Sequence, residues 1–124
     1  MHPSKGEGAV SFGSQNLINE LGGMSIGANN IVDGRYSFAV GKNNTVGFAA
    51  GIIGDNNTAR DLYDVAIGEK NTIVGGYAAL AVGESNSINS DRTLVTGFNN
   101  KLGLDANEAQ TENSKTVSEF VLGS

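Results

Sequence analysis

The stretch YSFAVGKNNTV, from Tyr36 to Val46, recurs as YDVAIGEKNTI from Tyr63 to Ile73. Each copy holds an apolar-x-apolar-Gly string, with asparagine three residues after the glycine. Such glycines occur along the chain at Gly13, Gly27, Gly41, Gly54, Gly68, Gly83, Gly97 and Gly123, with spacings of 14, 14, 13, 14, 15, 14 and 26 residues. The asparagine is present in all seven copies that extend that far: Asn16, Asn30, Asn44, Asn57, Asn71, Asn86 and Asn100. A fixed period of this kind takes precedence over local propensities in predicting a fold.

Each repeat has the pattern of two short strands. In SFAVG (37–41), apolar and small residues alternate with the period of two that is typical of a strand. The Gly-x-x-Asn that follows favours a turn, because both residue types tolerate a left-handed backbone. A second strand of about five residues carries one apolar residue five positions after the glycine. Two strands and two turns account for about 14 residues, which predicts an all-β stack of two-strand coils. Equivalent strands would form parallel sheets with a spacing of about 4.8 Å.

The two faces of the first strand differ in side-chain size. We expect the larger residues, one and three positions before each glycine, to fill the interior of the coil: Phe38, Val40, Val65, Ile67, Leu80 and Val82. The small residues two positions before the glycine, such as Ala39, Ala66 and Ala81, would then face a partner subunit, because small side chains let another backbone approach closely.

The recurring asparagine has two possible roles. One Asn per coil, always at the same turn position, would form a hydrogen-bonded ladder through the stack. Alternatively, Asn is simply the least strained residue for a corner with positive φ.

Composition excludes several classes of function. The chain of 124 residues has no cysteine and a single histidine, His2, which leaves almost no material for a zinc site or a nucleophile–histidine pair. We therefore expect no enzymatic activity, no cofactor and no metal. The net charge of −5 disfavours nucleic acid as a partner. No stretch has the ~18 apolar residues of a membrane span, so we expect no direct membrane insertion.

The repeats resemble the head domain of trimeric autotransporter adhesins, the YadA-like head built from Hep/Hag repeats. The strings that carry the resemblance are SFAVG (37–41), DVAIG (64–68), ALAVG (79–83) and GMSIG (23–27), with weaker copies AVSFG (9–13), AGIIG (50–54), TLVTG (93–97) and EFVLG (119–123). The resemblance covers residues 8–103 and resumes at Phe120.

The resemblance implies a left-handed parallel β-roll that packs as a homotrimer. It implies display at the bacterial cell surface, from a stalk and an outer-membrane anchor that lie outside this fragment. The implied function is non-enzymatic adhesion to host matrix, host cells, other bacteria or the protein's own kind. We expect residues 1–7 to be an N-terminal tail and residues 8–124 to be the head.

The repeat breaks once, between Gly97 and Gly123. The surplus of about 12 residues lies within 104–119, which is polar and acidic apart from Lys115. We expect an insertion loop that leaves the roll, so that FVLG can resume the stack. Because binding specificity is often carried by loops on a rigid scaffold, the candidate ligand contacts are Asp105, Glu108, Glu112 and Lys115.

Two weaker candidates remain. Asp55, Glu69 and Glu84 follow successive glycines and suggest either an acidic ridge for a cationic partner or, as we favour, a solvated column of turns. Tyr36, Tyr63 and Tyr77 would form an exposed aromatic line near the opposite turn or cover the end of the core.

Two other functions compete with adhesion. A structural segment of a phage tail fibre or another extracellular appendage would use the same roll as a spacer. An acyltransferase with left-handed hexapeptide repeats would need a period of six residues and a catalytic histidine, and the period of about 14 argues against it.

Overall fold

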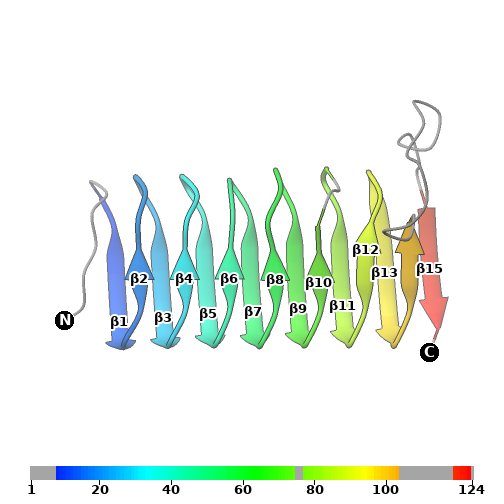
Figure 1. Cartoon of the computed structure of the whole chain (residues 1–124), viewed down its shortest axis with the longest axis horizontal. Coiled ribbons are helices and arrows are strands. Elements are labelled where there is room, and N and C mark those ends of the chain that lie inside the picture. The colour runs from blue at the N-terminus through cyan, green and yellow to red at the C-terminus, as the bar shows by residue number, and fades with distance from the viewer. Residues whose placement is uncertain (1–7, 75–76, 104–118, 124) are drawn as a thin grey trace.

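The computed structural model describes residues 8–74, 77–103 and 119–123, and in these residues the fold is all-β with no helix. It is a parallel β-solenoid in which each coil contributes one strand to each of two sheets (Figure 1). The eight-stranded sheet contains β1 (Val10–Ser14), β3 (Met24–Ala28), β5 (Phe38–Lys42), β7 (Gly51–Asp55), β9 (Val65–Glu69), β11 (Leu80–Glu84), β13 (Thr93–Phe98) and β15 (Glu119–Gly123). The seven-stranded sheet contains β2 (Leu17–Ile18), β4 (Ile31–Val32), β6 (Thr45–Val46), β8 (Thr58–Ala59), β10 (Thr72–Ile73), β12 (Ser87–Asn89) and β14 (Lys101–Gly103).

The register of the eight-stranded sheet follows the sequence repeat. Each repeat glycine pairs with the glycine of the next coil, as Gly41 does with Gly54 and Gly54 with Gly68. The predicted coils and parallel sheets are therefore confirmed, although the second strand has only two or three residues where about five were expected. A short second strand leaves the remaining residues of each coil to form its two corners.

The stack resumes after the break in the repeat, as predicted. β15 pairs directly with β13, and Gly123 lies opposite Gly97. The two ends of the described chain lie at opposite ends of the long axis (Figure 1). Most of the predicted insertion, residues 104–118, lies outside the described residues.

The expected facing of the first strand is wrong. The small column two positions before each glycine lies inside the coil, and Ala39, Ala66 and Ala81 are completely buried. Phe38, Val40, Val65, Ile67, Leu80 and Val82, which were expected inside, all retain solvent exposure. The apolar residue five positions after the glycine completes the interior: Ile18, Val32, Val46, Ala59, Ile73 and Ile88.

The narrow interior explains this reversal. The strands of one coil are joined by a turn of two residues, and in most coils a large side chain on one strand lies opposite a small one on the other. Ala39 accordingly shares a coil with Val46, and Ala66 shares one with Ile73. In the coil of Gly54 the sizes are exchanged, with Ile52 on the first strand and Ala59 on the second, both fully buried.

The repeat asparagines form a continuous ladder inside the solenoid. The side-chain Nδ2 of each Asn donates to Oδ1 of the Asn in the preceding coil, over 3.0–3.3 Å from Asn16 to Asn100. Left-handed φ values occur one residue earlier, as at Asn43 (57°), Asn56 (59°) and Lys70 (58°). The ladder asparagines are therefore present for their hydrogen bonds and not because of a positive φ.

The repeat glycines adopt a backbone conformation that only glycine tolerates well. Gly54 has φ 138°, and a Cβ added there would lie 1.8 Å from the carbonyl oxygen of Gly68. That same oxygen accepts a hydrogen bond from Nδ2 of Asn57 at 2.7 Å. Glycine and asparagine columns thus depend on each other, because the close approach of the coils brings the carbonyl within reach of the amide.

Candidate interaction surfaces

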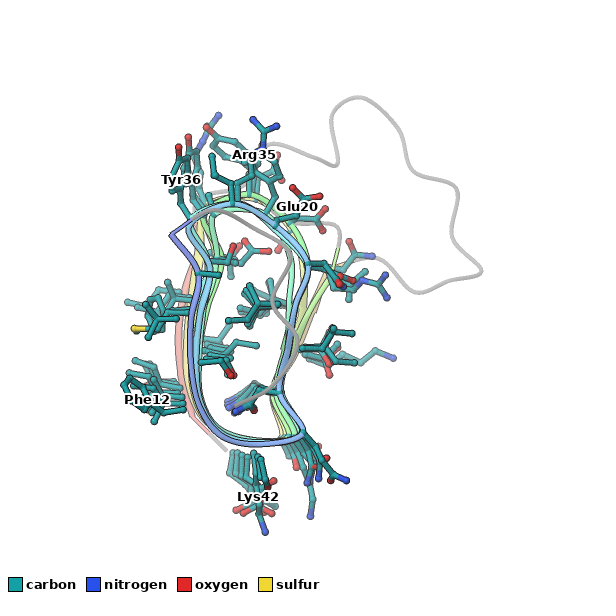
Figure 2. All side chains as sticks on the ribbon, turned by 90° about the vertical axis from the view of Figure 1, so that its left-hand side faces the viewer. Phe12, Glu20, Arg35, Tyr36 and Lys42 are labelled. Carbon is teal, nitrogen blue, oxygen red and sulfur yellow. The ribbon has the colours of Figure 1, made fainter. Side chains whose placement is uncertain are left out.

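Viewed along the stack, each coil presents a flat wall, a charged turn and a broad corner, marked in Figure 2 by Phe12, Lys42 and Tyr36. We call the wall the apolar face. It consists of the outward residues of the eight-stranded sheet, which lie one and three positions before the repeat glycines. Its most exposed members are Phe12 (63%), Ile53 (45%), Val10 (41%), Ile26 (39%) and Ile67 (36%).

The apolar face stays continuous even at the coil where glycine replaces one of its large residues. Gly51 takes the position that Phe38 and Val65 occupy in neighbouring coils. A Cβ at Gly51 would lie 2.4 Å from the Phe38 ring, so this ring covers the space that the missing side chain leaves. Soluble monomers rarely expose an apolar surface that runs along the whole molecule, which makes the face a candidate for protein association.

The charged turn lies at the end of the same strands. Lys42, Asp55, Glu69 and Glu84 are in register on successive coils. Lys42 Nζ lies 3.4 Å from Asp55 Oδ2, and Lys70 Nζ lies 3.2 Å from Glu69 Oε1. Among the described residues, no cluster of three or more acidic or histidine side chains could hold a metal ion. The arrangement thus fits the solvated column better than an acidic ridge, since cations already accompany two of its three carboxylates.

The opposite corner carries the exposed tyrosines. Tyr36, Tyr63 and Tyr77 are 69%, 55% and 44% exposed, and the rings of Tyr63 and Tyr77 meet edge to face with centroids 5.6 Å apart. Arg35 lies beside Tyr36 and forms a loose ion pair with Glu20, with 3.9 Å between Nε and Oε2 (Figure 2). The rings are exposed enough to contact a ligand, which agrees with the interpretation of the tyrosines as an exposed aromatic line.

A carboxylate is buried beneath this corner. Asp64 occupies the inward position four residues before Gly68, and its two oxygens accept hydrogen bonds from the backbone N–H groups of Ala79 (3.1 Å) and Asp61 (3.2 Å). Burial raises the pKa of Asp64 to about 6, although the two N–H groups oppose the shift. Ser37 fills the same role earlier in the stack, where its Oγ accepts from the N–H of Ala50 at 3.2 Å.

Between this corner and the seven-stranded sheet lies a feature that sequence reasoning missed. Two adjoining cavities of about 240 and 340 Å³ share Phe48 and Arg60, and we call them together the corner groove. Asp33, Gly34, Thr45, Val46 and Gly47 complete the first cavity, and Asp61, Leu62 and Tyr77 complete the second. Its members come from four coils, so only the stacking of the coils in register would have indicated it.

The four residues predicted to contact a ligand, Asp105, Glu108, Glu112 and Lys115, lie outside the described residues. In the part of the chain that is described, no helix is long and apolar enough to cross a membrane. No family model, no curated protein and no solved structure matches this chain.

Proposed function

We propose that this chain is a non-enzymatic adhesin head that acts as a homotrimer at a bacterial cell surface, in a left-handed coil as the sequence resemblance implies. The apolar face is the observation that carries the proposal. It follows the full stack from Val10 to Leu94, and the buried interior does not use it. Three rods packed around an axis through their apolar faces would remove this surface from water and leave the other surfaces outside.

The observed facing of the first strand favours association more than the expected facing would. A face of alanines would bury little area, whereas the outward column contains phenylalanine, isoleucine and valine. Burying a fully exposed large apolar side chain contributes about 1.5–3 kcal/mol of transfer free energy, and the members of the apolar face, which are already partly covered, would each contribute a fraction of this. Repetition at every coil gives one interface many equivalent contacts.

Light scattering tests the assembly. We expect the purified chain to have three times the subunit mass of 12.8 kDa. Ile67→Glu should dissociate it while the circular dichroism of β-structure is kept. The matched control is Thr72→Glu, which changes an exposed residue of the same coil on the other sheet. A stable monomer at micromolar concentration, or equal dissociation by both variants, would contradict the proposal.

Adhesion requires a separate assay. Beads coated with the parent protein should adhere to immobilised matrix protein, to cultured cells or to one another, whereas uncoated beads should not. Absence of adherence to all three surfaces by a protein that is trimeric in solution would leave the assembly intact and reject the adhesive function.

A further inference from the structure

The corner groove combines aromatic walls with paired hydrogen-bonding groups. Phe48 is 48% exposed and Tyr77 is 44% exposed, and they lie on coils separated by the coil that contributes Leu62. Both rings line the larger cavity, so the groove offers two planar apolar surfaces along the stack. Neither ring is needed to fill the interior of the solenoid, which is closed by other columns.

The groove carries charges of both signs, one guanidinium and two carboxylates. Arg60 is exposed and forms no ion pair within the described part of the chain. Asp33 lines the first cavity beside it and Asp61 lines the second. An anionic ligand would meet these carboxylates and a cationic ligand would meet the guanidinium. The groove therefore favours a neutral ligand that can both accept and donate hydrogen bonds.

Part of the lining of the first cavity is glycine backbone. Gly34 and Gly47 stack so closely that a Cβ on Gly34 would lie 2.2 Å from the carbonyl oxygen of Gly47. With glycine at both positions, neither residue contributes a side chain to the cavity. Asp33, Arg60 and Phe48 all line the first cavity, and Arg60 and Phe48 also line the second.

From these features we infer that the corner groove binds a neutral oligosaccharide. A pyranose ring has one apolar face of C–H groups, which packs on an aromatic ring, and a rim of hydroxyls that donate and accept. Arg60 would donate to neighbouring hydroxyl oxygens through its fork of N–H groups, and Asp33 and Asp61 would accept from hydroxyl protons. Two adjoining cavities along the stack suit at least two consecutive sugar rings.

The location of the groove is compatible with the proposed trimer, on which this inference rests for its biological setting. Thr45 and Val46 of β6 contribute to the groove, and β6 belongs to the sheet opposite the apolar face. Packing of three apolar faces would leave each groove open to solvent. A trimer would present three copies, so weak individual sites would add by multivalency.

Saturation-transfer NMR on the full chain tests the inference with cellobiose, lactose and maltose as probes. We expect transfer from protein to the ring C–H protons of at least one disaccharide, with a dissociation constant on the order of 1 mM because the groove is open. Phe48→Ala and Tyr77→Ala should each weaken binding about tenfold, whereas Phe48→Tyr should retain it. Tyr36→Ala is the matched control, since this tyrosine lies on the same corner and does not line the groove.

Circular dichroism identifies any variant that has lost its fold. Phe48 and Tyr77 lie on different coils, so if one alanine variant does not fold, the other still tests the inference. No transfer to any of the three probes would overturn the inference. Tighter binding of a sulfated heparin disaccharide than of every neutral probe would overturn it as well, since the groove would then be an anion site.

A cell-based arm separates this inference from the adhesive function. Periodate destroys vicinal diols of surface glycans and should reduce adherence of coated beads to cells, and Phe48→Ala should have the same effect. Undiminished adherence under both conditions would refute a role of the corner groove in adhesion while adhesion itself stands, and would point to a protein ligand. If the parent protein does not adhere at all, the adhesive function is refuted. The NMR titration would still decide whether the corner groove binds a sugar.

Discussion

Replacing one ladder asparagine by aspartate exchanges a single heavy atom of the interior, the amide nitrogen for an oxygen, and should destabilise the solenoid severely. Nδ2 of Asn57 donates to Asn44 Oδ1 at 3.3 Å and to the carbonyl oxygen of Gly68 at 2.7 Å. Its Oδ1 accepts from the backbone N–H of Asn71 at 2.9 Å and from Nδ2 of Asn71 at 3.1 Å. Asn57→Asp keeps both acceptors but replaces both donors by an oxygen that faces two other oxygens.

The magnitude follows from these contacts. Each lost hydrogen bond costs about 1 kcal/mol, and a buried charged oxygen that faces two acceptors costs a few kcal/mol more. We expect the free energy of unfolding to fall by about 3 to 5 kcal/mol at pH 7. Burial raises the folded-state pKa of the introduced carboxyl above its unfolded value, so part of the stability should return as the pH falls and the protonated group donates to Gly68.

Urea unfolding followed by circular dichroism, at one fixed protein concentration, measures this effect. Asn56→Asp is the matched control, because Asn56 is the neighbouring residue, is exposed, and has no side-chain hydrogen bond in the ladder. It introduces the same charge at the same turn and should change the free energy of unfolding by less than about 0.5 kcal/mol. If the two variants unfold at the same urea concentration, the ladder does not stabilise the coil as described.

Three further predictions concern the interior. Ala66→Arg places a charge in a closed interior and should abolish folding, whereas Val65→Asp on the apolar face should keep the β-structure and weaken association; circular dichroism and light scattering on both variants would show the opposite pattern if Ala66 faced outward. Ser25 is fully buried with no hydrogen-bond partner for its Oγ, so Ser25→Ala should raise the free energy of unfolding by about 1 kcal/mol, and a lower urea midpoint would reveal a partner for that hydroxyl. Because the pKa of Asp64 is raised from 3.8 to about 6, its contribution to stability is complete below about pH 4 and is lost as the pH rises through 6. Relative to Asp64→Asn, the parent protein should lose up to about 3 kcal/mol between pH 4 and pH 7, and parallel pH profiles for the two proteins would contradict the shift.

The periodicity of the chain was sufficient to predict the coils and their parallel sheets. Recurrence of Gly and Asn with a spacing of 13 to 15 residues leaves few other ways to bury the apolar positions. This repetition also predicted that the glycines pair in register and that the stack resumes at Phe120. It allowed the asparagines to form a hydrogen-bonded ladder. Local alternation alone, however, assigns residues to two faces without saying which face is inside.

A signal for the facing was nevertheless present in the sequence. Ile52 and Ala59 belong to one coil and reverse the small and large residues that Ala39 and Val46, for example, show in another. Such compensation in size is expected only between side chains that share one interior. The prediction gave more weight to the size of single columns and so placed the phenylalanines and isoleucines inside.

The corner groove had no comparable signal. Asp33, Phe48, Arg60 and Tyr77 follow no motif, and their neighbourhood depends on how corners of slightly different length align. The coil from Gly41 to Gly54 is one residue shorter than the two before it, which places Phe48 and Ala49 where the preceding coil has Arg35 and Tyr36. Which side chains lie close together across coils of unequal length can be seen only in the three-dimensional structure.

The direction of the backbone hydrogen bonds has a mechanical consequence. In both sheets these bonds join one coil to the next and therefore run along the long axis of the rod. Tension between the ends of a subunit pulls each bond along its own direction, so coils separate one row after another instead of shearing together. A released coil of about 14 residues spans at most about 45–50 Å when extended, in place of a rise of about 4.8 Å. A tethered rod of this construction lengthens in steps under load and dissipates work at each step, which protects whatever contact holds its far end.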